Sequence, residues 1–208
     1  STELLLRCRD VYGSLRPASE RLGHGYSANG DFLSVVFRTL EPLCPSQGPA
    51  ITTALLFDQS RSAQPTWFLL EDGGAWSEIV RRGQVFDPKL SQLGSGSGWA
   101  LWIDVLRTLG VQLDAPPPSA QTERSAVVLL MGQDSSDGVL SIDRATGLLQ
   151  LRWHSDRNMR LYNTQTRLAH DLAQALGGEL VLNPLWKQLH QPITIHNLGG
   201  CNMGESAR

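Results

Sequence analysis

The sequence predicts an α+β fold, with a mainly antiparallel sheet of about five or six strands and helices packed on one face. Three observations predict it. Short apolar runs with the composition of strands are separated by segments rich in glycine and proline. Most connections between neighbouring strands are too short for a helical crossover, so these strands should run antiparallel. Helical periodicity occurs in a few separate segments, which is typical of the α+β class.

The first third of the chain is expected to contain one helix and three strands. Residues 2–12 have helical spacing of apolar side chains. Residues 13–31 contain many glycines and predict a loop. Strands are expected at residues 32–40, 51–57 and 66–71.

The middle of the chain is expected to be mostly helix and loop. Short helices are predicted at residues 76–82 and 99–109, the second ended by Gly110. The glycine run at residues 94–98 does not follow a buried strand, so it predicts a flexible loop and not a nucleotide-binding turn. Residues 111–125 predict another flexible loop, because few of them are suited to burial.

The last part of the chain is expected to add a strand, a hairpin, a long helix and a final strand. Residues 126–131 are a fully apolar strand, and the turn at residues 145–147 predicts a hairpin between 139–142 and 148–153. Alternation in the second hairpin strand predicts one buried face carrying Leu149, Leu151 and Trp153. Residues 157–176 predict the longest helix, and residues 192–196 the last strand, ended by His196. The stripe expected to bury that helix consists of Leu161, Leu168, Leu172 and Leu176.

Composition excludes several classes of function. The chain has 208 residues, is 41% hydrophobic, and carries a net charge of −2 without a run of lysine and arginine, so we expect no nucleic-acid partner. No stretch approaches the ~20 apolar residues of a membrane span. The cysteines form no CxxC pair, so reduced thiols and, by default, a cytoplasmic location are expected. His and Cys are not clustered, so no metal site is expected.

The C-terminal block of residues 193–204, Ile-Thr-Ile-His-Asn-Leu-Gly-Gly-Cys-Asn-Met-Gly, carries the strongest signal of function. A histidine is followed at once by a glycine-rich turn, and glycine lets backbone approach a flat ligand closely. The block resembles the H-P-L-G-G-C-x-M-G signature of glucose-methanol-choline oxidoreductases, especially their cholesterol-oxidase-like branch. The family's catalytic histidine falls on His196. Asn197 replaces the usual proline, which should loosen the turn, because only proline fixes φ.

Three other stretches are similar to the same family in order and spacing. Residues 1–6 resemble the helix that leaves the FAD domain, and residues 23–31, Gly-His-Gly-Tyr-Ser-Ala-Asn-Gly-Asp, resemble the loop that approaches the flavin. Residues 67–71, Trp-Phe-Leu-Leu-Glu, resemble the strand whose glutamate moves a proton during steroid isomerisation, which places that role on Glu71. The resemblance implies flavin-proximal positions at Asn29, Gly30, Gly199 and Gly200.

The resemblance implies that residues 1–208 are the substrate-binding domain of an FAD-dependent oxidoreductase acting on a bulky apolar alcohol, such as a 3-hydroxysteroid. Its expected partner is the FAD-binding domain of its own longer chain. No dinucleotide fingerprint is present, so we expect this chain alone to hold no FAD and to self-associate through its docking face. Three alternatives remain: Glu71 as a solvated strand end, Asn29 and Gly30 as ordinary turn residues, and a binding module without catalysis.

Overall fold

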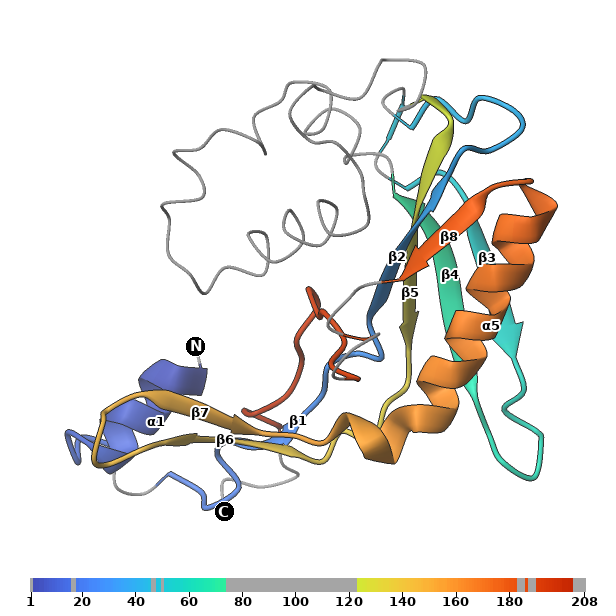
Figure 1. The fold of residues 1–208 in the computed structure, drawn as a ribbon. Helices are drawn as coiled ribbons and strands as arrows, with labels where there is room; N and C mark the ends of the chain where they lie inside the picture. Colours follow the sequence, from blue (N-terminus) through green and yellow to red (C-terminus); the bar gives the residue numbers. More distant parts are fainter. Residues whose placement is uncertain are drawn as a thin grey trace, which may run out of the picture.

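The described part of the chain forms two antiparallel sheets and two α-helices (Figure 1). The computed structural model describes residues 2–15, 18–45, 48–49, 51–73, 123–182, 186 and 190–203. The predicted α+β class and the antiparallel pairing are confirmed. The helices predicted at 76–82 and 99–109, the glycine run at 94–98 and residues 111–122 of the predicted flexible loop lie outside the described residues.

The larger sheet has five strands in the order β3-β4-β5-β2-β8. Its strands are β2 (Phe32–Phe37), β3 (Ala54–Asp58), β4 (Trp67–Gly73), β5 (Ser125–Gly132) and β8 (Glu179–Leu182). Four of them match predicted strands to within a few residues. The pattern analysis missed β8, a four-residue strand that pairs with β2 directly after the long helix ends.

Helix α5 (Met159–Ala175) packs on one face of the larger sheet and follows a short 3₁₀ turn at Ser155–Asn158 (Figure 1). Gly177, which directly follows the predicted helix, has a φ of +63° and ends it. The residues that face the sheet differ in part from the predicted leucine stripe. The buried side chains of α5 are Leu161, Tyr162, Gln165, Ala169 and Ala173, whereas Leu168, Leu172 and Leu176 are only partly buried.

The smaller sheet has three strands in the order β1-β6-β7, with helix α1 (Thr2–Asp10) lying against β6. The strands are β1 (His24–Tyr26), β6 (Gly138–Ile142) and β7 (Leu149–Arg152). Strand β1 lies within residues predicted to be a loop. The predicted buried face is wrong for Leu149 and Leu151, which are 39% and 47% exposed on the edge strand β7, whereas Trp153 is partly buried against the core.

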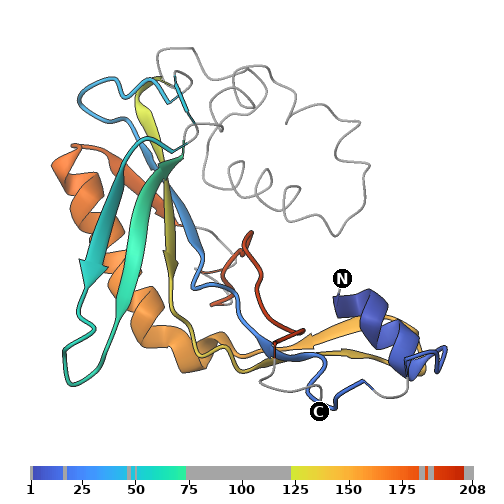
Figure 2. The same cartoon turned by 180° about the vertical axis from the view of Figure 1, so that it is seen from behind.

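Residues 190–203, called the C-terminal segment below, lie over the face of the larger sheet that α5 leaves free (Figures 1 and 2). Ile193 packs there against Leu33, Val35 and Val127. The strand predicted at residues 192–196 is wrong: the segment has no strand pairing there. The backbone N–H groups of Ile195 and His196 instead donate hydrogen bonds to the Asp31 side chain.

Tyr162, at the centre of the core, gives a test of the packing on α5. Its side chain is completely buried, and its hydroxyl has no hydrogen-bond partner among the described residues. Burial raises the pKa of the Tyr162 phenol, and the negative charges of Asp134 and Asp31 raise it further. The folded chain therefore keeps this phenol neutral at a pH where the unfolded chain ionises it.

The stability contributed by the neutral Tyr162 should be complete below about pH 10 and fall by about 1.4 kcal/mol per pH unit above it. Tyr162→Phe removes the titrating group while losing only an unpaired hydroxyl. The free energy of unfolding of the variant, relative to wild type, should rise between about pH 9 and about pH 11 in urea titrations. A difference that does not change with pH would contradict the assignment.

Candidate functional site

The C-terminal segment is joined by backbone hydrogen bonds to the loop at residues 23–31, the 23–31 loop. Ser27 and Leu198 form an antiparallel bridge, in which each N–H donates to the other's carbonyl at 3.0 Å. The Gly23 N–H donates to the Gly200 carbonyl at 2.7 Å, and the Gly200 N–H donates to the His24 carbonyl at 3.1 Å. The two segments, which carry the predicted flavin-proximal residues, therefore lie side by side.

Glycine is required at this junction by the chain's own packing. A Cβ atom on Gly199, whose φ is +82°, would lie 1.8 Å from the Gly25 carbonyl oxygen. A Cβ on Gly200 would lie 2.8 Å from Thr2, and one on Gly30 would lie 2.7 Å from the Gly132 carbonyl oxygen. The close contacts at these glycines are with the chain's own atoms. The predicted approach of this backbone to a flat ligand stays a prediction.

Asp31 connects the 23–31 loop to the histidine of the C-terminal segment. Its side chain is completely buried. Its Oδ2 accepts hydrogen bonds from the backbone N–H groups of Ile195 at 2.7 Å and His196 at 2.8 Å. The Thr194 hydroxyl lies 3.2 Å from the same oxygen. Because the Asp31 carboxylate accepts hydrogen bonds from these two amides, they do not pair with a strand, which explains the wrong strand prediction.

His196 lies with its ring against the same carboxylate. Its Nδ1 is 3.3 Å from Asp31 Oδ1 and 3.2 Å from Asp31 Oδ2. The His196 side chain is 43% exposed. Nε2 is on the opposite edge of the ring from Nδ1, and within the described part of the chain it has no hydrogen-bond partner. The arrangement provides an oriented imidazole whose second nitrogen has no partner in the described part of the chain.

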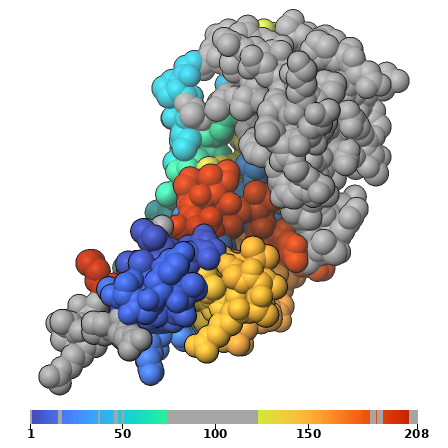
Figure 3. All heavy atoms as spheres, turned by 90° about the vertical axis from the view of Figure 1, so that its left-hand side faces the viewer, coloured from blue at the N-terminus to red at the C-terminus, as the bar shows by residue number. Residues whose placement is uncertain are grey.

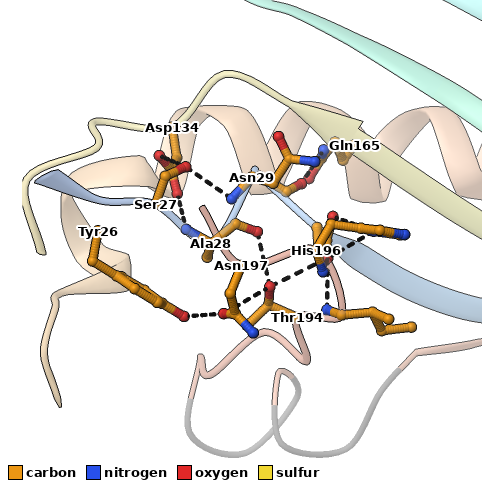
Figure 4. A network of polar contacts seen from close by, with 12 residues as sticks. Tyr26, Ser27, Ala28, Asn29, Asp134, Gln165, Thr194, His196 and Asn197 are labelled. Atoms are coloured by element: carbon orange, nitrogen blue, oxygen red, sulfur yellow. Dashed lines mark hydrogen bonds and ion pairs between the residues drawn. The ribbon is translucent and has the colours of Figure 1, made fainter. Parts of the chain in front are cut away.

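Asn197, which stands where the resembling signature has proline, is held by a side-chain contact. The buried Tyr26 hydroxyl donates a hydrogen bond to Asn197 Oδ1 (Figure 4). Burial raises the pKa of the Tyr26 phenol, and the negative charges of Asp134 and Asp31 raise it further. Tyr26 therefore stays a neutral donor. This hydrogen bond restrains the turn, which the replacement of proline by Asn197 was expected to loosen.

A second buried carboxylate, that of Asp134, holds the other side of the 23–31 loop. It accepts a hydrogen bond from the Ser27 hydroxyl at 2.7 Å and one from the Ala28 N–H at 2.7 Å. From α5, the buried Gln165 amide donates to the Gly30 carbonyl at 2.8 Å. These contacts fix the loop that carries Asp31 from both sides (Figure 4).

Glu71 lies within β4, not at its end, and only 9% of it is exposed. Glu71 pairs with Leu129, which in turn pairs with Leu33. Paired residues share a face of the sheet, and Leu33 is in the cluster that Ile193 covers. Glu71 therefore points to the same side of the larger sheet as the C-terminal segment. The alternative of a solvated strand end is wrong.

The Glu71 carboxyl group is only partly satisfied. Its Oε2 atom is buried and has no hydrogen-bond partner among the residues that the structure describes. Neighbouring positions on the same sheet face are apolar, including Leu69 and Leu129. An unpaired carboxyl oxygen among apolar neighbours is costly to maintain for folding alone, and such groups are common where a ligand or a proton is handled.

A cavity of about 480 Å³ lies between the 23–31 loop, the C-terminal segment and the start of β4. The residues that line it include Ser27, Asn29, Trp67, Asp134, Leu198 and Gly199. Of the four predicted flavin-proximal positions, Asn29 and Gly199 line this cavity, whereas Gly30 and Gly200 do not. The Asn29 side-chain amide has no partner in the described part of the chain, so it is available to a ligand.

Sequence reasoning missed the two buried aspartates and Tyr26 as parts of this site. In the sequence, Asp31 stands out only as the last residue of the 23–31 loop, which resembles a loop of the family. Its one local signal is an acid directly before the apolar strand that begins at Phe32. The role of Asp134 depends on contacts more than 100 residues away along the chain, which a local pattern does not contain.

The comparisons with known proteins add no family. No protein-family model matches the chain, and no curated protein matches it significantly. Among the described helices, none is long and apolar enough to cross a membrane.

Proposed function

We propose that this chain is the substrate-binding domain of an FAD-dependent oxidoreductase that oxidises the hydroxyl group of a bulky apolar alcohol, with 3-hydroxysteroids as the first class to test. The observation that carries the proposal is the geometry of His196. Its imidazole is oriented by the buried Asp31, and its other nitrogen has no partner among the described residues, in a segment whose Leu198 and Gly199 line a cavity. The resemblance of residues 193–204 to the family signature supports the same assignment.

In the proposed reaction, a side chain of this chain must accept one proton from the alcohol. When FAD is bound, its flavin ring supplies the acceptor for the hydride that leaves the carbinol carbon. The hydroxyl proton must also leave as the C=O bond forms. His196 Nε2 is suited to accept it, because imidazole exchanges protons readily near neutral pH. Asp31 holds the ring while this happens.

The cavity is compatible with the ring end of FAD. Its volume lies within the ordinary range of small-molecule sites. The free Asn29 amide and backbone at Gly199 offer polar contacts to a planar heterocycle. These residues would hold the ring, while the rest of the cofactor is left to the FAD-binding domain that the resemblance implies.

Exposed apolar side chains on the smaller sheet support that domain as the partner. They come from α1, β7 and the C-terminal segment, which adjoin one another in Figure 3. They include Leu4, Leu151, Ile195, Leu198 and Met203, and the exposed Tyr12 and Leu148 lie directly beside α1 and β7. Apolar side chains exposed together are typical of surfaces that bury against another domain.

Glu71 is proposed to move a proton during isomerisation of the steroid double bond, and not during oxidation. In the full-length flavoenzyme, Glu71→Gln should keep the oxidation rate within about threefold of wild type. It should lower isomerisation about 100-fold, because an amide cannot take and return a proton. The two products of a 3-hydroxysteroid, separated by chromatography, measure both rates. Equal losses of both activities would contradict this division of roles.

Anaerobic mixing tests the function itself. The full-length protein, loaded with FAD, is mixed without oxygen with 3-hydroxysteroids and other bulky secondary alcohols. Loss of the absorbance of oxidised flavin at about 450 nm supports the proposal. If the protein binds these alcohols but none bleaches the flavin, the chain is the alternative, a binding module that kept the fold without the chemistry.

A further inference from the structure

The contact between Asp31 and His196 differs from an ordinary surface ion pair. The Asp31 carboxylate is completely buried, and no lysine or arginine among the described residues pairs with it. Its Oδ2 accepts two backbone N–H groups. Its Oδ1 has the His196 ring as its one partner within the described part of the chain.

We propose that Asp31 is a positioning residue that fixes His196 in the tautomer protonated at Nδ1 and so leaves Nε2 as the free proton acceptor. An ionised carboxylate only accepts hydrogen bonds, so the ring nitrogen that faces it must carry hydrogen. The same carboxylate holds the backbone N–H of His196, so ring and backbone are aligned by one group. The tautomer follows from geometry alone; its catalytic consequence rests on the proposed function.

The buried position of Asp31 strengthens this selection. If His196 carried its hydrogen on Nε2 instead, the lone pair of Nδ1 would face both oxygens of the Asp31 carboxylate. Asp31 Oδ1 would then have no hydrogen-bond donor, although Asp31 is completely buried. An unpaired buried acceptor is strongly disfavoured. When Nε2 takes the hydroxyl proton, both ring nitrogens carry hydrogen, and Nδ1 keeps its contact with Asp31.

The tautomer can be read directly by ¹⁵N NMR. The chain is labelled with ¹⁵N-histidine, and two-bond ¹H–¹⁵N correlations are recorded at alkaline pH, where imidazole is neutral. His196→Gln identifies the His196 signals by their absence, among the five histidines of the chain. In wild type we expect His196 to show a protonated Nδ1 and an unprotonated Nε2. A protonated Nε2 in wild type would overturn the proposal.

Two variants separate Asp31 from a general effect on the loop. Asp31→Asn should convert His196 to a mixture of tautomers or to the Nε2-protonated form. Asp134→Asn is the matched control, since Asp134 is the other buried carboxylate that holds the 23–31 loop but has no contact with His196. It should leave the His196 tautomer unchanged. An unchanged tautomer in a folded Asp31→Asn variant overturns the proposal; if that variant does not fold, the wild-type spectrum decides.

The catalytic consequence has its own readout in the flavin-loaded full-length protein. Asp31→Asn should lower the rate of flavin reduction at saturating alcohol about 100-fold, with KM little changed. Failure of wild type to oxidise any alcohol, with the Nδ1-protonated tautomer present, would overturn the proposed function and not the tautomer. Oxidation by wild type with an unaltered rate in Asp31→Asn would overturn the positioning role and not the function.

Discussion

Replacing His196 by glutamine in the flavin-loaded full-length protein is expected to lower the rate of alcohol oxidation about 1,000-fold. Glutamine keeps a polar side chain of similar reach but cannot accept a proton at neutral pH. The alcohol must then lose its hydroxyl proton without an imidazole at this position to accept it. Because the ring is partly exposed and the glutamine amide can also donate a hydrogen bond to Asp31, the substitution should leave the fold intact.

The measurement is the rate of flavin reduction under anaerobic rapid mixing at saturating alcohol, which isolates the chemical step from reoxidation. His170→Gln is the matched control, because His170 is exposed on α5, which packs on the opposite face of the larger sheet. It should keep the wild-type rate. A His196→Gln enzyme that reduces its flavin as fast as wild type would remove His196 from the proposed chemistry and leave the signature as a structural turn.

Elements with long, regular patterns could be predicted from the sequence. The helix at residues 157–176 and the strand at residues 126–131 were expected within about two residues of α5 and β5, because each carries many apolar positions at one period. Short elements could not. β1 and β8 have three and four residues, and their strand character comes from pairing with β6 and β2, which a local window does not contain.

Burial was predicted less well than secondary structure, since it depends on what a strand packs against. The alternation of Leu149 and Leu151 is regular, yet β7 is an edge strand and both side chains are exposed. Glu71 shows the opposite case: an acid next to glycines suggests solvent, but its neighbours on β4 and β5 bury it. In each case the sequence determined the face and the tertiary neighbours determined the exposure.

The sequence indicates the residues of the candidate site that stand in motifs, but not the residues that hold them in place. His196, Asn29 and Gly199 stand in motifs that can be recognised locally, and all lie around the junction of the 23–31 loop with the C-terminal segment. Asp31 lies 165 positions from His196, so no spacing rule joins them. The partner of a catalytic side chain is often of this kind, because a support needs only geometry and one acceptor.

The junction itself predicts the largest effect on stability, at Gly199. Gly199→Ala should lower the free energy of unfolding by about 3–4 kcal/mol, from left-handed backbone strain of about 1–2 kcal/mol and a clash that forces a backbone shift. The added Cβ would meet the Gly25 carbonyl oxygen at 1.8 Å, and backbone cannot move aside as a flexible side chain would. The bridge between Ser27 and Leu198, next to it, should weaken at the same time.

Gly147→Ala is the matched control for this substitution. Gly147 has a similar φ of +69°, in the hairpin turn between β6 and β7, but an added Cβ there would meet nothing within 4 Å. It should therefore lose only the backbone term, about 1–2 kcal/mol. Urea unfolding of both variants, compared at equal m-values, gives the difference of about 2 kcal/mol that belongs to the contact between Gly199 and Gly25. Equal losses in the two variants would mean that the C-terminal segment does not pack tightly on the 23–31 loop, and the His196 geometry that depends on this packing would lose its support.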